Sequence, residues 1–246
     1  GIKYFSDLEC LSSKESNLIE ADLSGMVKLR SFSCGEGNLQ SLNLSGCTAL
    51  DFVSCQFNRL TQIDLTGCSA LIDLMCNHNR LTKLDVSDCV QLEQISIYEN
   101  QIASIDVSKN KKLIHFTVVP QEVTVQKFQK NGKWTIDLGA LVGKENLGKI
   151  TYYNIGELNA ATGLLTFDTE PTDFNYTYKA SEAYRMDVHV TLYRGVLPII
   201  TANNITIDPR DAALDPFKEP GLNLNAVDAE DGNLTANVKA QVKTVA

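Results

Sequence analysis

The stretch LIDLMCNHNRL, from Leu71 to Leu81, recurs along the first half of the chain at a spacing of 21 residues. A unit of this length is too short to bury its own apolar residues, so neighbouring units must stack and share a core. The repeat therefore predicts a solenoid. The related stretches run from Leu29 to Leu39, Leu50 to Leu60 and Leu92 to Ile102, with half-matches from Leu8 to Leu18 and from Leu113 onward.

The unit matches the leucine-rich consensus L-x-x-L-x-L-x-x-N-x-L, with Cys76 in the third leucine position. This consensus predicts one parallel strand per unit, and side chains alternate between the two faces of a strand. Leu74 and Cys76 are therefore expected in the core, with the residues between such pairs facing solvent. The expected fold class is an α/β-type leucine-rich repeat solenoid, mostly β with short turns on its convex side, over residues 1–119.

All seven cysteines lie within the first 89 residues, and six of them follow the period in two series. Ile97 and Val118 occupy the column of the first series, which indicates that packing is the shared requirement, since a thiol packs as a small hydrophobe. Neighbours that point the same way lack the side-chain vectors and dihedral of a disulfide, so both series are predicted to be reduced. Cys10 is the one cysteine expected at the surface. The first series is Cys34, Cys55 and Cys76, and the second is Cys47, Cys68 and Cys89.

Two further columns are predicted to be structural. The asparagines Asn58, Asn79 and Asn100 can satisfy the backbone of a tight turn and form a ladder with one another. Aspartates recur with a following Ser or Thr, and such side chains bond readily to nearby backbone amides. Stacked carboxylates could alternatively hold calcium, but the glycine-rich nonapeptide of calcium-binding solenoids is absent. These aspartates are Asp22, Asp64, Asp85 and Asp106.

After Pro120 the 21-residue period ends and short alternating segments begin. In Met186 to Leu192 every second residue is apolar, which is typical of a half-buried strand, and several such segments separated by turn residues predict a small all-β sandwich. We expect an immunoglobulin-like domain over 120–195 that covers the end of the solenoid. Trp134 is expected in its core rather than in a ligand platform.

From residue 196 the sequence resembles the opening strands of a second bacterial immunoglobulin-like domain, although such sandwiches need ~100 residues. We therefore expect a partial domain over 196–246, and a protease should cut it first, between Leu197 and Asn204. The segment from Asp228 to Gly232 contains three carboxylates. It forms either an acidic turn or part of a calcium site, since hard cations bind carboxylate oxygens.

The net charge of −8 and the pI near 4.9 disfavour nucleic acid and anionic membranes, which both attract clustered Lys and Arg. No apolar run reaches the ~20 residues that span a bilayer, and nothing at Gly1 resembles a signal peptide. The three histidines offer neither a nucleophile–base pair nor a metal cluster, so no cofactor and no metal are expected. Two enzymatic alternatives stay open, a catalytic Cys10 and a glycan-directed carboxylate pair of Asp73 with Glu99.

The outward residues of three successive units form the candidate binding face. Exposed Phe, Met and Tyr among small polar residues resemble the composition of binding hot spots. Alternatively, the face is solvated and merely tolerates them, and the chain is a structural stalk without a ligand of its own. The candidate face comprises Phe52, Ser54, Gln56, Phe57, Asp73, Met75, Asn77, His78, Gln94, Ser96, Tyr98 and Glu99.

The 21-residue unit, with one cysteine in the strand and a second near the back turn, resembles the cysteine-ladder internalins, surface proteins of Gram-positive bacteria. The resemblance covers roughly residues 2–119. It implies an extracellular location at the bacterial surface, immunoglobulin-like domains beside the repeats, and a concave strand face that binds a protein or glycoprotein; we expect a monomer. The signal peptide, helical cap and sorting motif of that family are not found in this sequence. We therefore expect either a trimmed mature chain or an excised part of a longer one.

Overall fold

The computed structural model describes residues 4–14 and 17–194. Beyond these it describes only the backbone of four two-residue strands, in which β17 pairs with β18 and β19 with β20. The expected partial domain over 196–246, its protease site and the candidate calcium ligands otherwise lie outside the described residues. The four strands are β17 (Thr201–Ala202), β18 (Leu224–Asn225), β19 (Val227–Asp228) and β20 (Gly232–Asn233).

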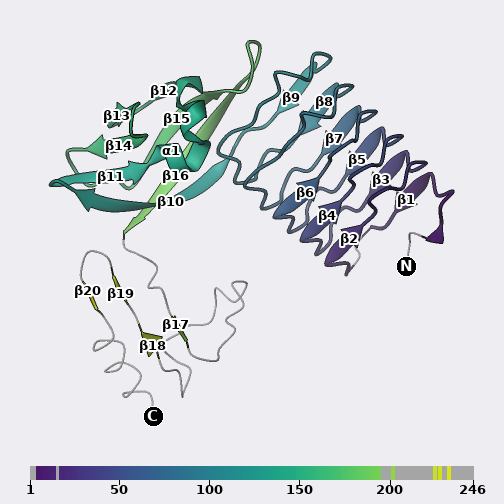
Figure 1. Cartoon of the computed structure of the whole chain (residues 1–246), viewed down its shortest axis with the longest axis horizontal. Helices are drawn as coiled ribbons and strands as arrows, with labels where there is room; N and C mark the ends of the chain where they lie inside the picture. Colours follow the sequence, from purple (N-terminus) through teal and green to yellow (C-terminus); the bar gives the residue numbers. More distant parts are fainter. Residues whose placement is uncertain are drawn as a thin grey trace.

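Successive repeats stack into one six-stranded parallel sheet, which confirms the predicted solenoid (Figure 1). Equivalent residues of neighbouring turns lie directly side by side, as Phe52 does with Asp73 and Asp73 with Gln94. Each turn therefore supplies one row of a continuous surface. The strands are β1 (Cys10–Ser12), β3 (Ser31–Ser33), β5 (Phe52–Ser54), β7 (Asp73–Met75), β8 (Gln94–Ser96) and β9 (His115–Thr117).

A second parallel sheet lies on the other side of the early turns, where the consensus led us to expect only turns. Its strands are β2 (Glu20–Asp22), β4 (Ser41–Asn43) and β6 (Gln62–Asp64). Leu42 at the centre of β4 is buried, so this segment also alternates between core and solvent. The equivalent segments of the next two turns, near residues 83 and 104, form no strand and line a junction described below.

The first cysteine series forms a buried ladder behind the six-stranded sheet. Cys34, Cys55 and Cys76 are fully buried, and Ile97 continues their column. The sulfurs of Cys55 and Cys76 are 2.8 Å apart, and this contact together with burial raises the pKa of Cys55 well above its usual value. The seven cysteines, all within the described residues, form no disulfide, as predicted, and Cys10 is exposed.

The second cysteine series adds a hydrogen-bonding role that the sequence analysis missed. Cys47 Sγ donates to the Leu23 carbonyl and Cys68 Sγ to the Leu44 carbonyl, each at 3.2 Å. Asn110, one period after the last cysteine of the series, makes the same kind of bond from Nδ2 to the Val86 carbonyl at 2.9 Å. A buried carbonyl without a partner is costly, so a donor is needed in this column.

The asparagine column binds the backbone of adjacent turns. Asn79 Oδ1 accepts from the Leu60 amide at 2.9 Å, and Nδ2 donates to the carbonyls of Cys55 and Cys76 at 3.0 and 3.1 Å. Asn58 and Asn100 make equivalent bonds. Gln121 continues the column beyond Pro120, because it accepts from the amide of Ile102 at 2.9 Å.

The aspartate column caps turns, as predicted. Asp64 Oδ1 accepts from the Thr66 amide at 2.9 Å, and Asp85 accepts from the Ser87 amide at 2.8 Å. Hydrogen bonds from the side chain of Thr66 and, to a smaller extent, from its backbone amide lower the pKa of Asp64. Asp22 and Asp106 make the same two-residue bond.

Residues 122–194 form a single curled sheet of seven strands, in the order β12-β15-β16-β10-β11-β14-β13. The first part of the long strand β10 pairs in parallel with β16, while its last residues pair antiparallel with β11, so the sheet folds over on itself. The predicted immunoglobulin-like sandwich thus takes the form of one curled sheet whose two halves share β10. The strands are β10 (Glu122–Lys130), β11 (Lys133–Asp137), β12 (Ile150–Tyr153), β13 (Glu157–Asn159), β14 (Leu164–Phe167), β15 (Asp173–Lys179) and β16 (Arg185–Arg194).

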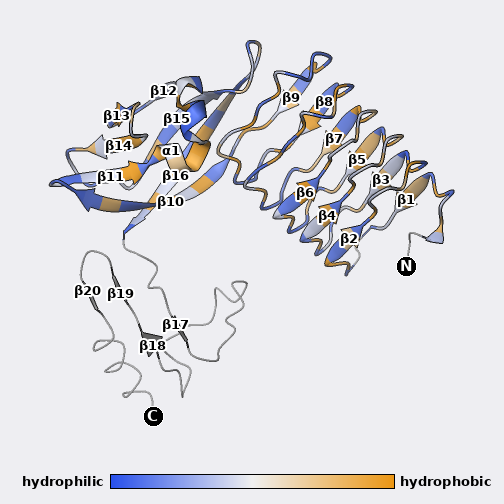
Figure 2. Cartoon of the chain, viewed as in Figure 1, coloured by the Kyte–Doolittle hydropathy of each residue, from blue (hydrophilic) through white to orange (hydrophobic). Residues whose placement is uncertain are grey.

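The two halves of the curled sheet enclose an apolar core. Phe167 of β14 and Phe174 of β15 pack with ring centroids 6.1 Å apart, and Trp134 is buried, as predicted. Helix α1 (Leu138–Val142) is apolar and contributes to this core (Figure 2), and the 3₁₀ helix η2 (Lys144–Lys149) follows it. The domain is thus all-β apart from these two short helices.

The curled sheet covers the end of the solenoid, as expected for a cap. Tyr176, which is almost fully buried, donates from its hydroxyl to the Ala103 carbonyl at 2.6 Å. The hydroxyl of Tyr184 donates to the Leu113 carbonyl at 2.7 Å. One continuous core of buried residues runs from the repeats into the sheet. The cap is therefore part of the same packed unit and not a loosely tethered neighbour.

Candidate binding face

The strand register gathers the predicted face into rows. Phe52, Asp73 and Gln94 occupy one row across β5, β7 and β8. A second row, at the ends of the same strands, holds Ser54, Met75 and Ser96. We call the outward side of the six-stranded sheet the strand face. Its twelve predicted residues thus come from three adjacent turns.

Two of the twelve residues are buried and not exposed as predicted. Ser54 is 9% exposed and Asn77 is 6% exposed. Strands only three residues long bring the flanking turns close, and the Ser96 hydroxyl donates to Asn77 Oδ1 at 3.3 Å. The Ser54 hydroxyl donates to Gln56 Oε1 at 3.5 Å, so both buried side chains contact polar neighbours. Of the others, Phe57, Gln94 and Glu99 are exposed, and Phe52, Gln56, Asp73, Met75, His78, Ser96 and Tyr98 are half-buried.

The turns that follow the strands place four residues in the left-handed backbone region, one per turn. Their φ angles are 57° at Glu36, 55° at Phe57, 54° at His78 and 52° at Glu99. We call this set the turn column. Left-handed backbone favours Gly and Asn, and it costs other residues on the order of 1 kcal/mol each. An aromatic residue at such a position is a true outlier.

Three aromatic side chains of these turns contact one another, and we call them the aromatic cluster. The rings of Phe57 and His78 stack with centroids 4.1 Å apart and planes 15° apart. Tyr98 meets His78 edge-on at 5.1 Å. His78 Nδ1 lies 2.6 Å from Glu99 Oε2, so the imidazole is held between a ring and a carboxylate. The cluster therefore links the side chains of three successive turns, in addition to the backbone bonds between those turns.

Carboxylates crowd the other end of the strands. Burial raises the pKa of Asp73, and the nearby charges of Glu93 and Asp51 raise it further. Among the described residues, Asp73 Oδ1 is buried without a hydrogen-bond partner. Asp51 is paired with Arg30 at 3.1 Å. The strand face therefore carries negative charge that its own cations do not fully neutralise.

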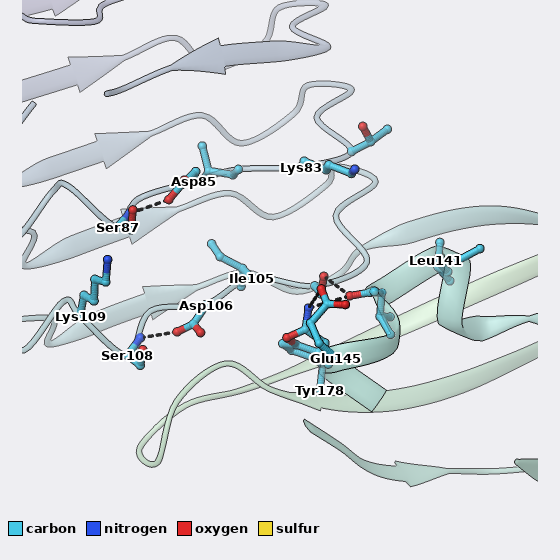
Figure 3. A pocket seen from close by; sticks show the side chains of 17 residues that line it. Lys83, Asp85, Ser87, Ile105, Asp106, Ser108, Lys109, Leu141, Glu145 and Tyr178 are labelled. Carbon is cyan, nitrogen blue, oxygen red and sulfur yellow. Dashed lines mark hydrogen bonds between the residues drawn. The ribbon is translucent and has the colours of Figure 1, made fainter. Parts of the chain in front are cut away.

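A cavity of about 570 Å³ lies away from this face, between the last repeats and α1 (Figure 3). Its carboxylates are already engaged, because Asp85 and Asp106 accept from the amides of Ser87 and Ser108. Lys149 also binds Asp106 at 2.7 Å, and this bond is the main reason that the pKa of Asp106 falls to about 2. The polar residues of the cavity thus cap turns and hold the last repeats against the curled sheet.

Other kinds of site receive little support. In the described part of the chain, no three His, Cys, Asp or Glu side chains gather as a metal site would require. Within the same residues, no helix is long and apolar enough to cross a membrane. The histidines are dispersed: His78 contacts Glu99, His115 lies in β9, and His189 Nδ1 lies 2.9 Å from the side-chain oxygen of Asn175.

Sequence reasoning placed Phe57, His78 and Glu99 on the candidate face but did not recognise that they form one column with Glu36. Glu36 was not among the predicted residues, and neither the ring stack nor the shared left-handed backbone was foreseen. The available signal was the 21-residue spacing of Glu36, Phe57, His78 and Glu99. That signal is weak because the four residue types share no chemistry, whereas the cysteines and asparagines repeat by type.

These features define a class: the chain has the fold of an internalin-like leucine-rich repeat protein, a β-solenoid with a cysteine ladder followed by a curled β-sheet. The functional domain of InlJ from Listeria monocytogenes, described as including a cysteine ladder, aligns with a TM-score of 0.54 at 20% identity, over 78% of this chain and 50% of that chain. The Listeria monocytogenes internalin-like protein lmo2027 aligns with a TM-score of 0.44 at 18% identity, over 75% of this chain and 64% of that chain.

This likeness concerns the fold. The chain spans half the length of the InlJ structure and less than two thirds of lmo2027. No protein-family model and no curated protein sequence matches it. Function must therefore be argued from the face itself.

Proposed function

We propose that this protein is an extracellular binding protein of the bacterial surface, an adhesion module that captures a protein or glycoprotein with its strand face and turn column. The observation that carries the proposal is the aromatic cluster outside the core, in which Phe57 and His78 project from left-handed backbone. The internalin-like fold supports a role in binding, and the curled sheet then acts as cap and spacer. The proposal includes no cofactor and no catalysis.

The cluster is hard to explain by folding alone. Val53, Cys55 and Leu60 already supply the core of the turn that carries Phe57, and Phe57 itself is 47% exposed. A strained backbone position with an exposed ring is more typical of a functional surface than of a packing site. Aromatic residues are also enriched at the centres of protein interfaces, because a rigid ring offers a large contact area.

The competing function is a structural stalk without a ligand. A stalk needs the solenoid core, the ladders and the cap, all of which are internal, and it gains nothing from an exposed ring at a strained position. The two functions therefore differ in one consequence: a binding protein loses its ligand when the cluster is removed, and a stalk has no ligand to lose.

The test begins with the immobilised protein and an array of purified extracellular proteins and glycoproteins. A variant with Phe52, Phe57 and Tyr98 all changed to Ala should lose the partners that the parent captures. Removing anchors worth about 2 kcal/mol or more in total weakens binding at least about 30-fold. Tyr152→Ala is the matched control, because Tyr152 is 59% exposed on β12 of the cap.

Stability must be measured beside binding. The triple variant should melt close to the parent, because none of the three rings lies in the buried core. A folded triple variant that still captures its partner would refute the proposed face. Absence of any specific partner for the parent would favour the stalk.

A further inference from the structure

We infer that the partner docks through a basic segment, whose Arg or Lys side chains meet the aromatic cluster and the carboxylates around it. This inference rests on the proposed function and adds the chemistry of the partner. Its basis is the order of side chains in the turn column, the crowding of carboxylates at the opposite end of the strands, and the lack of Lys and Arg among the twelve face residues.

The turn column places its two rings between two carboxylates. Glu36, Phe57, His78 and Glu99 come from four successive turns, so the aromatic pair has an acidic neighbour on either side. Backbone bonds fix this order, since the amide of Phe57 donates to the Asn77 carbonyl and the amide of His78 to the Tyr98 carbonyl, each at 3.1 Å. A ring face beside a carboxylate suits a guanidinium or ammonium group, through cation–π attraction and an ion pair together.

A second acidic group lies at the start of the strands. Asp73 and Glu93 form no ion pair within the described residues, and their mutual repulsion contributes to the raised pKa of Asp73. A cation brought by a partner would relieve this repulsion. An extended basic segment that runs along β7 can reach both the aromatic cluster and Asp73, which lie toward opposite ends of β7 and its turn.

Two cations beside this surface are already paired with carboxylates. Arg30 binds Asp51 at 3.1 Å, and Lys14 binds Glu36 at 3.3 Å. The twelve face residues include no Lys or Arg, so an anionic partner would find no cation among them and would meet the carboxylates of Asp73 and Glu93. A wholly apolar partner would remove water from those carboxylates without replacing it, which is costly. Charge complementarity therefore selects a basic partner, in a protein whose net charge is −8.

The experiment uses two labelled peptides of equal length, one alternating Arg and Ser and one alternating Gln and Ser. Fluorescence anisotropy with the full chain should show binding of the Arg peptide at least tenfold tighter than that of the Gln peptide. Two variants test the two sites: Phe57→Asn with His78→Asn in the turn column, and Asp73→Asn on the strand face. Each should weaken binding of the Arg peptide at least fivefold.

The controls separate a specific site from general attraction to an acidic protein. Glu157→Gln removes one negative charge from an exposed side chain of the cap, and Tyr152→Ala removes an exposed ring there. Both should change the affinity less than twofold. Asn tolerates left-handed backbone well, so the Asn variants should melt at or above the temperature of the parent, and the single Phe57→Asn variant provides a second readout if the double variant is unstable.

The outcomes are distinct. Equal binding of both peptides, or equal losses in Glu157→Gln and Asp73→Asn, would overturn the basic-segment inference. If an array partner depends on Phe57 but neither Asp73→Asn nor the Arg peptide affects its binding, the proposed function stands and this inference fails. If the triple Ala variant keeps its array partner, the proposed function itself fails, whatever the Arg peptide does.

Discussion

Changing Asn79 to Ala should destabilise the protein strongly without touching its surface. Asn79 is 9% exposed, and its side chain serves the amide of Leu60 and the carbonyls of Cys55 and Cys76 at 2.9–3.1 Å. Ala leaves all three backbone groups buried without these partners. The fold around them cannot readily supply others, because the same groups hold three consecutive turns in register.

The magnitude follows from these three bonds. At roughly 1 kcal/mol net for each, the loss is about 3 kcal/mol, and imperfect rescue by water keeps it below the full desolvation penalty. Typical domains have only about 5–15 kcal/mol of unfolding free energy. With a urea m-value of about 2 kcal/mol/M, the midpoint should fall by about 1.5 M.

Urea titration, followed by both far-UV circular dichroism and Trp134 fluorescence, measures the effect. Trp134 reports the cap and circular dichroism reports the repeats as well, so coincident transitions would show that the continuous core unfolds as one unit. Asn38→Ala is the matched control, because in the described structure the Asn38 side chain forms no hydrogen bond, and it should change stability by less than about 0.5 kcal/mol. A loss in Asn79→Ala no larger than in Asn38→Ala would refute the ladder argument.

Three other predictions address thiols, the junction and the strand face. In the native protein a thiol reagent should modify only the exposed Cys10 rapidly, because burial protects the other thiols and raises the pKa of Cys68, for example, to about 12. After denaturation without reductant, all seven thiols should react. Detection of only one free thiol would mean that the other six cysteines form disulfides. Lys149→Met should lower stability at pH 7 by about 0.5 kcal/mol in thermal melts. Because the pKa of Asp106 is lowered to about 2 in the folded state, this difference should disappear as pH falls from about 4 to 2, and a constant difference would contradict the ion pair. Asp73→Asn should stabilise the protein by about 0.5 kcal/mol at pH 7. The pKa of Asp73 is raised in the folded state, so its ionised carboxylate destabilises the fold at any pH above the pKa that Asp has in the unfolded chain. The gain should therefore shrink below about pH 4.

The solenoid could be predicted because repetition makes a local pattern report a global structure. When Cys55, Cys76 and Ile97 occupy one column, each copy supports the same inward direction, and the stacking of neighbours follows from the need to bury short units. The same logic identified the asparagine ladder and the aspartate caps, since their hydrogen bonds run to backbone groups at constant sequence offsets. The rows of the strand face also followed from this register.

The features that the sequence left undetermined depend on contacts between residues that share no period. Asn77 is buried beside the next turn, where Ser96 donates to its side-chain oxygen, and alternation within one strand does not capture such a contact. The cap curls into one sheet because β10 exchanges partners midway, from β16 to β11, and the pairing with β16 joins residues about 70 positions apart. The aromatic cluster required the backbone conformation itself. A left-handed φ at Phe57 and His78 turns two unlike side chains into a stacked pair, and no residue type at those positions announces that geometry.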